Sequence, residues 1–108
     1  MNLTRACSLA EVTVGSALAV NVDGVGIVVV RVEDDVFAMK DECSHAAIPL
    51  SEGEVEGCEI ECWLHGSRFD LRTGKPSGPP ATEPVPTFAV RVEGDDILVD
   101  VTRPLDTA

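Results

Sequence analysis

Residues 16–32, SALAVNVDGVGIVVVRV, indicate a β fold. The runs 16–22 and 26–32 are rich in β-branched valine, which fits a pleated strand better than a helix. The pair Asp23-Gly24 lies between them and favours a tight turn. Val28-Val29-Val30 has no polar face, which is typical of a central strand that is covered on both sides. This stretch therefore predicts neighbouring strands of a sheet.

The same pattern continues along the chain. Turn signals at Glu33-Asp34-Asp35 and Thr73-Gly74 end further short runs. Alternating apolar residues in 88–93 and 97–102 flank Gly94-Asp95 and predict a C-terminal hairpin. Ser8-Leu9-Ala10-Glu11 has the spacing of a capping box and could begin a single helical turn. We predict an all-β, antiparallel fold in a single domain over residues 1–108.

Composition excludes several classes of partner. The chain has 108 residues, with 8 Lys and Arg against 19 Asp and Glu, and a net charge of −11. Binding to nucleic acid or to an anionic membrane surface needs a basic footprint, so neither is expected. No apolar run approaches the ~18 residues of a membrane span, and the N-terminus does not resemble a secretory signal. We expect a monomer in the cytoplasm, where cysteines are thiols or metal ligands.

Two short motifs carry the chemistry. Cys43-Ser44-His45 is C-x-H and Cys62-Trp63-Leu64-His65 is C-x-x-H, and together they use both histidines of the chain. Thiolate and imidazole are ligands for soft and borderline transition metals. Zinc fingers usually group two cysteines and then two histidines, whereas each motif here mixes the two types. That order suits a two-iron centre with His ligands on one iron, although a zinc site or an ordinary packing role for each residue stays open.

The strings CSHAAIPLSEG (residues 43–53) and ECWLHGSRFDLRTGKPSG (residues 61–78) resemble the two cluster-binding loops of Rieske-type ferredoxins. The resemblance covers nearly the whole chain. It implies an antiparallel β-sandwich with a small inserted cluster-binding subdomain, here about residues 41–80. It also implies one Rieske [2Fe–2S] cluster per chain, held by the following ligands: Cys43 and Cys62 on one iron, His45 and His65 on the other.

The resemblance implies a soluble one-electron carrier and not an enzyme. It would accept electrons from a flavin reductase and pass them to a terminal oxygenase, by default a ring-hydroxylating dioxygenase. The catalytic domain of an oxygenase would need a far longer chain. The alternatives are an electron carrier for another redox system, such as iron–sulfur cluster assembly, or a structural zinc protein.

The surroundings of the implied cluster bear on its reduction potential. Ser67 matches a hydroxyl donor of high-potential relatives, but Phe69 stands where they have a Tyr, and the chain has no Tyr. Fewer hydrogen bonds to the cysteine sulfurs predict a potential on the order of −150 mV and not +300 mV. The disulfide that joins the two loops in high-potential relatives falls on Ile48 and Leu64 here, so we expect that clamp to be missing.

The sequence is less specific about the roles of the other residues near the motifs. Pro79 and Pro80 match the proline loop that covers the cluster in the family, and Trp63 reads as a packing residue. Cys7 and Cys58 read as small buried apolar residues. Residues 41–61 contain seven acidic residues and no Lys or Arg. This acidic run could steer a basic redox partner, or it could only maintain solubility.

Overall fold

The computed structural model describes residues 3–33, 35–43, 48–62, 66–77, 83–102 and 104–105. Within these ranges the chain is all-β, with two short 3₁₀ turns and no α-helix. It also contains no helix that is long and apolar enough to cross a bilayer. The predicted antiparallel all-β class is confirmed.

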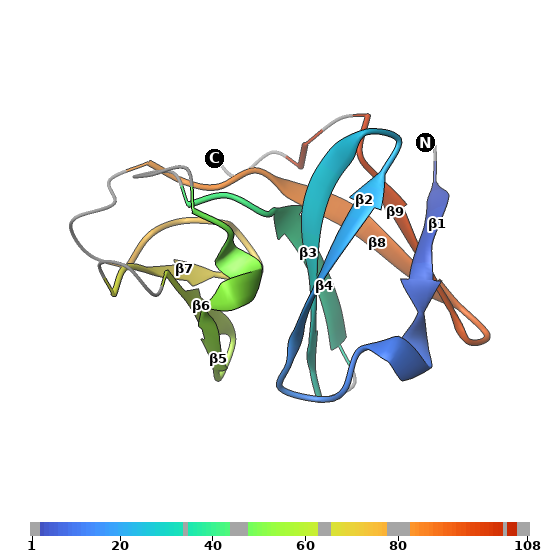
Figure 1. Cartoon of the computed structure of the whole chain (residues 1–108), viewed down its shortest axis with the longest axis horizontal. Coiled ribbons are helices and arrows are strands. Elements are labelled where there is room, and N and C mark those ends of the chain that lie inside the picture. The colour runs from blue at the N-terminus through green and yellow to red at the C-terminus, as the bar shows by residue number, and fades with distance from the viewer. Residues whose placement is uncertain are drawn as a thin grey trace.

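The strands form a large and a small antiparallel sheet (Figure 1). The large sheet has the order β1-β9-β8-β4-β3-β2 and the small one β5-β6-β7. The members of the large sheet are β1 (Thr4–Ser8), β2 (Ala17–Val22), β3 (Val25–Val32), β4 (Asp35–Lys40), β8 (Thr87–Glu93) and β9 (Asp96–Asp100). Those of the small sheet are β5 (Glu54–Glu56), β6 (Glu59–Glu61) and β7 (Arg68–Asp70).

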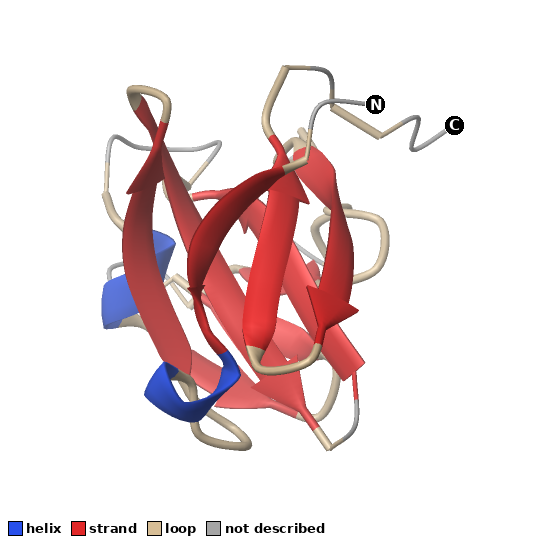
Figure 2. Ribbon diagram, turned by 90° about the vertical axis from the view of Figure 1, so that its right-hand side faces the viewer, coloured by secondary structure: helices blue, strands red, loops and turns tan. Residues whose placement is uncertain are grey.

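The large sheet is strongly curled, so that its edge strands β1 and β2 contact each other (Figure 2). The hydroxyl of Thr4 donates a hydrogen bond to Asp23 at 3.3 Å across these edges. The predicted hairpins are present, with Val22 paired to Val25 and Glu93 paired to Asp96. The predicted helical turn is the 3₁₀ turn η1 (Leu9–Glu11), whose N-cap residue Ser8 donates its N–H to the Glu11 carboxylate at 3.2 Å.

Strand β3 explains why the valine run is apolar on both faces. Ile27 and Val29 point into one core cluster, inside the curled sheet, together with residues of β1 and β9. Val28 and Val30 point into a second cluster, which the large sheet shares with the small sheet. All four side chains are fully buried. The small sheet is therefore fixed by the outer face of the same strand that organises the inner core.

The small sheet has one apolar and one charged face. Val55, Ile60 and Phe69 are cross-strand neighbours in register, and all three belong to or pack against the second core cluster. The intervening residues point to the opposite face because side chains alternate along a strand. Strands β5 and β6 were not among the predicted strands, although the alternation of charged and apolar residues in Glu54-Val55-Glu56 and Glu59-Ile60-Glu61 is typical of strands with one buried face.

Candidate metal centre

Cys43 lies where β4 gives way to the first of the two predicted ligand loops. Its side chain is buried, with 3% of its surface exposed. Its backbone N–H donates to the carbonyl of Ile48 at 2.9 Å. This bond closes a loop over residues 43–48, which we call the first cysteine loop.

Cys62 follows directly after β6 and is fully buried. Its N–H donates to the carbonyl of Ser67 at 2.7 Å, and the N–H of Gly66 donates back to the Cys62 carbonyl at 2.9 Å. Gly66 has a φ of +73°, a conformation that glycine adopts readily in a tight turn. These bonds close the second cysteine loop, residues 62–67, which has the same span as the first.

Both thiols belong to a single core cluster with Leu50, Ile60 and Phe69. Two soft sulfur donors thus converge on one apolar region, each at the start of a closed loop. This arrangement fits a group that takes two thiolates, because burial shields a charged metal centre from water. None of the four cysteines of the chain is in a disulfide.

Several predicted site residues fall outside the described part of the chain. They are His45, Trp63, His65, Pro79 and Pro80. The structure therefore places the two predicted cysteine ligands but not the two histidines. Among the described residues there is no group of three or more metal-binding side chains.

Three residues that the sequence reading did not single out hold the cysteine loops in place. The carboxylate of Asp41 accepts two hydrogen bonds from Ser51, one from its N–H and one from its hydroxyl, both at 2.7 Å. Gly53 lies against β6, where a Cβ atom would be 1.6 Å from the carbonyl oxygen of Glu61. Gly53 therefore permits the exit of the first loop to approach the residue that precedes Cys62.

The segment after β7 returns to the large sheet through another close approach. The N–H of Val85 donates to the carbonyl of Gly74 at 2.8 Å. A Cβ atom at Gly74 would lie 2.0 Å from the Val85 carbonyl oxygen, and Gly74 has a φ of +78°. Glycine is thus required where the two ends of the proline-rich segment meet.

Ser67 and Phe69, the residues expected to influence the potential, are both buried. Ser67 is 2% exposed and Phe69 is fully buried. Phe69 shares the core cluster of the two cysteines, so its ring has an apolar environment. Phe69 therefore packs in the core, and its ring has no group that could donate a hydrogen bond.

The outer face of the small sheet is strongly acidic. Cross-strand register places two charged rows on it. Glu54, Glu61 and Arg68 form the first row, and Glu56, Glu59 and Asp70 form the second. Arg68 approaches Glu61 at 3.2 Å and Glu56 at 3.4 Å. The pKa of its guanidinium is raised, and the hydrogen bond to Glu61 is the largest cause. We call the acidic members the carboxylate face: Glu54, Glu56, Glu59, Glu61 and Asp70.

The remaining two cysteines differ from each other. Cys7 is buried in β1 with 3% of its surface exposed, as expected. Cys58 is only half-buried at the turn between β5 and β6, so the expectation that it is buried is wrong. Burial raises the pKa of both thiols, with smaller contributions from nearby carboxylates. Both groups therefore stay protonated near neutral pH.

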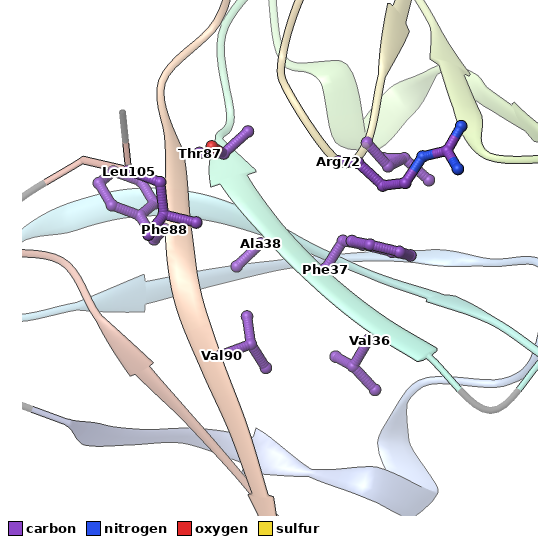
Figure 3. A pocket seen from close by; sticks show the side chains of 9 residues that line it. Val36, Phe37, Ala38, Arg72, Thr87, Phe88, Val90 and Leu105 are labelled. Carbon is purple, nitrogen blue, oxygen red and sulfur yellow. The ribbon is translucent and has the colours of Figure 1, made fainter. Parts of the chain in front are cut away.

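A small pocket of about 200 Å³ lies between β4 and β8 (Figure 3). The two strands pair only at Ala38–Phe88 and Met39–Thr87 and then separate. Its walls are mostly apolar, and the buried Thr87 hydroxyl, which lines it, has no hydrogen-bond partner in the described structure. Neither Cys43 nor Cys62 lines this pocket, so it is not part of the candidate centre.

Comparisons with known proteins show which family the chain resembles over most of its length. A family model described as "Rieske [2Fe-2S] domain" matches residues 2–89. The biphenyl dioxygenase ferredoxin subunit of Pseudomonas sp. (strain KKS102) is 42% identical over 104 residues, which cover 95% of each chain.

Two solved structures show the same fold. The ferredoxin of carbazole 1,9a-dioxygenase from Nocardioides aromaticivorans IC177 has a TM-score of 0.87 and 40% identity, covering 92% of this chain and 97% of that one. The second is a complex of reduced oxygenase and oxidized ferredoxin in carbazole 1,9a-dioxygenase. It matches with a TM-score of 0.89 and 33% identity over 96% of this chain and 97% of that chain.

Proposed function

This chain belongs to the Rieske [2Fe–2S] domain family, and from that premise we propose that Cys43 and Cys62 bind one iron of its cluster and His45 and His65 the other. Two observations support the cysteine half of this ligand set. Both thiols are buried in one apolar core cluster, and each begins a loop that is closed by a hydrogen bond from the cysteine N–H. The histidine half rests on the family motif.

The chain is a ferredoxin-type electron carrier and not an enzyme, like its relatives in ring-hydroxylating dioxygenase systems. A bound [2Fe–2S] cluster supplies a one-electron redox couple. The protein positions the thiolates and keeps water from them with Leu50, Ile60 and Phe69. The observation that carries this function is the burial of both thiols at the start of the two closed loops.

We propose that the electron acceptor is a terminal oxygenase and that the donor is a flavin-dependent reductase. The solved complex of oxygenase and ferredoxin supports the first partner. A flavin suits the role of the second partner, because flavins can take an electron pair from a hydride donor and pass the electrons on one at a time to a one-electron carrier.

The carboxylate face offers a means of recognising these partners. It presents five carboxylates and pairs two of them with Arg68. A concentrated negative field raises the association rate with a basic surface. The alternative is that the face only keeps the protein in solution, and the salt dependence of electron transfer distinguishes the two roles.

We further propose that the chain works as a monomer in the cytoplasm. The four cysteines are not joined by disulfides, which suits a reducing compartment. Size-exclusion chromatography with light scattering would test the monomer, and a dimer at micromolar concentration would contradict it.

The ligand assignment is tested with four single serine substitutions. Cys43→Ser and Cys62→Ser should abolish the brown colour and the rhombic EPR signal that dithionite reduction gives in the parent protein. Cys7→Ser and Cys58→Ser are matched controls that should retain both. Iron and sulfide should be present at about two each per chain in the parent protein. A colourless protein with one bound zinc would overturn the proposal.

A further inference from the structure

The two cysteine loops are closed in different ways. The second loop joins β6 to β7, and the backbone ladder of this hairpin reaches its base, with Glu61 paired to Arg68 and Ile60 paired to Phe69. The ladder continues into the bond between Cys62 N–H and the Ser67 carbonyl. Backbone hydrogen bonds that continue the strand pairing therefore hold the ends of this loop together.

No such ladder flanks the first loop. The described elements on either side of it are β4, which pairs with β3 and β8, and the 3₁₀ turn η2 (Leu50–Glu52), and these two elements are not paired with each other. The bond from Cys43 N–H to the Ile48 carbonyl is the inner closure. The outer closure is made by a side chain, because Asp41 accepts both the N–H and the hydroxyl of Ser51.

Asp41 is itself anchored to the large sheet. Its N–H donates to the carbonyl of Gly26 at 3.0 Å, and Gly26 lies in β3. Asp41 thus links two parts of the structure. Its backbone is bonded to the central strand β3, and its carboxylate is bonded to Ser51 on the far side of the first cysteine loop. Hydrogen bonds to a charged acceptor are stronger than neutral ones, which suits a link that has no ladder behind it.

We propose that Asp41 is a positioning residue for the metal centre: its carboxylate clamps Ser51 and holds the first cysteine loop closed, as the β6–β7 ladder holds the second. This inference rests on the proposed assignment of Cys43 as a ligand. It predicts that loss of the clamp loosens the first loop selectively and leaves the second loop unchanged.

The variants distinguish the effect of losing the clamp from the effects of changing the charge and of lowering the overall stability. Asp41→Ala removes both bonds, whereas Ser51→Ala removes only the hydroxyl bond and changes no charge. Asp41→Asn retains one acceptor and gains a donor for the Ser51 hydroxyl, so it should restore much of the closure. Glu42→Gln is the charge control, because exposed Glu42 contacts Lys40 at 3.7 Å and lies beside Cys43 in sequence.

Arg68→Gln is the matched control for the second loop. It removes a side-chain link between β6 and β7, namely the 3.2 Å contact with Glu61, but leaves the backbone ladder. Since the ladder carries the closure there, this variant should behave like the parent protein. Ion pairs that are exposed to water contribute little in any case.

Hydrogen exchange of the cluster-loaded protein is the principal measurement, followed on peptides that carry the Cys43 and Cys62 amides. Asp41→Ala should accelerate exchange in the first peptide roughly tenfold or more, because two bonds to a charged group are lost. Ser51→Ala should have a smaller effect in the same direction. The second peptide should exchange as in the parent protein.

Two further readouts report on the centre itself. Bleaching by an iron chelator should be faster in Asp41→Ala and Ser51→Ala than in Glu42→Gln, and Asp41→Asn should recover toward the parent rate. The EPR g-values should shift in the first two variants only. If Asp41→Ala does not fold, Ser51→Ala and Asp41→Asn still decide the question.

The outcomes distinguish this inference from the proposed function. A parent protein without a rhombic EPR signal would overturn the proposed function. A parent protein with that signal, whose Ser51→Ala variant exchanges and bleaches like Glu42→Gln, would overturn the clamp alone. Equal acceleration in both peptides would also overturn it, because that result means general destabilisation.

Discussion

Gly53 and Glu61 approach so closely that a Cβ atom on Gly53 would lie 1.6 Å from the Glu61 carbonyl oxygen. Gly53 follows η2 at the exit of the first cysteine loop, and Glu61 is the last residue of β6, directly before Cys62. The spacing of the two loops is thus set where two backbones touch. A side chain of any size at Gly53 would separate them.

The first prediction is that Gly53→Ala lowers stability and cluster content although it alters no ligand. The φ of Gly53 is −87°, which alanine adopts easily, so the cost is steric. Overpacking a rigid contact costs about 1–3 kcal/mol, and backbone atoms cannot rotate away as a side chain would. Thermal unfolding followed by circular dichroism and iron content per chain measure the effect.

Gly26→Ala is the matched control for this substitution. Gly26 lies in β3, and a Cβ atom there would meet nothing within 4 Å. Its alanine variant should unfold at the parent temperature or slightly above and keep its iron, because alanine restricts the unfolded chain. Parent-like iron content in Gly53→Ala would contradict the steric argument.

The second prediction concerns the carboxylate face. Glu54→Gln combined with Glu59→Gln removes two negative charges from it while Glu56 and Glu61 keep their contacts with Arg68. If the face steers a basic partner, the association rate with that partner should fall about two- to fivefold at low ionic strength. Stopped-flow reduction by the cognate reductase across a salt series measures this rate.

The charge control lies at the opposite end of the molecule. Glu93→Gln combined with Asp95→Asn removes two charges from the β8–β9 hairpin, which is far from the small sheet (Figure 1). The control should retain the parent rate and salt slope. Equal slopes for the parent protein and both variants would leave the carboxylate face with a role in solubility only.

The third prediction is that Phe69→Tyr raises the reduction potential. Phe69 is fully buried in the core cluster that contains Cys43 and Cys62. A phenol there would donate a hydrogen bond to a sulfur ligand and favour the more negative, reduced state, so the potential should rise from a parent value on the order of −150 mV. Protein-film voltammetry measures both values.

Phe88→Tyr is the control for the added hydroxyl. Phe88 is 6% exposed and belongs to the other core cluster, inside the curled sheet. Its tyrosine variant should keep the parent potential whatever its stability. A parent midpoint above about +100 mV would contradict the low-potential prediction itself.

Sequence patterns predicted the features that depend on neighbouring residues. The triple valine gave a correct prediction for β3, and the capping box at Ser8 predicted η1, because periodicity and caps act locally. Cys43 and Cys62, which their motifs singled out, are both buried, and their role as ligands stays a prediction. The histidines stay predictions, since they lie outside the described residues.

Contacts between distant segments could not be predicted in this way. The bonds of Asp41 to Ser51 and the approach of Gly53 to Glu61 depend on how η2 packs against β6, and no periodic signal encodes that packing. The pairing of β1 with β9 also follows from the closure of the large sheet. Such contacts join segments whose spacing is set only by the assembled core.

The last prediction concerns Cys7 and alkaline pH. Burial and the charge of Glu11 raise the pKa of the Cys7 thiol in the folded chain. In the unfolded chain a cysteine ionises near pH 8.5, so between that pH and the folded pKa the unfolded state binds fewer protons. The thiol's contribution to stability is therefore complete below about pH 8.5 and decreases as the pH rises toward the folded-state pKa.

Cys7→Ala removes this ionisation, so the free energy of unfolding of the variant should decrease less as the pH rises. Urea unfolding between pH 7 and pH 10 should show a smaller decrease in midpoint for the variant than for the parent protein, even though the variant starts from a lower value because of the lost volume.

Alkylation gives an independent check. At pH 7 the half-buried Cys58 should react with iodoacetamide faster than Cys7, and both more slowly than glutathione, because their raised pKa values keep them protonated. Parallel pH profiles for Cys7→Ala and the parent protein would show that the buried thiol does not contribute to the alkaline transition.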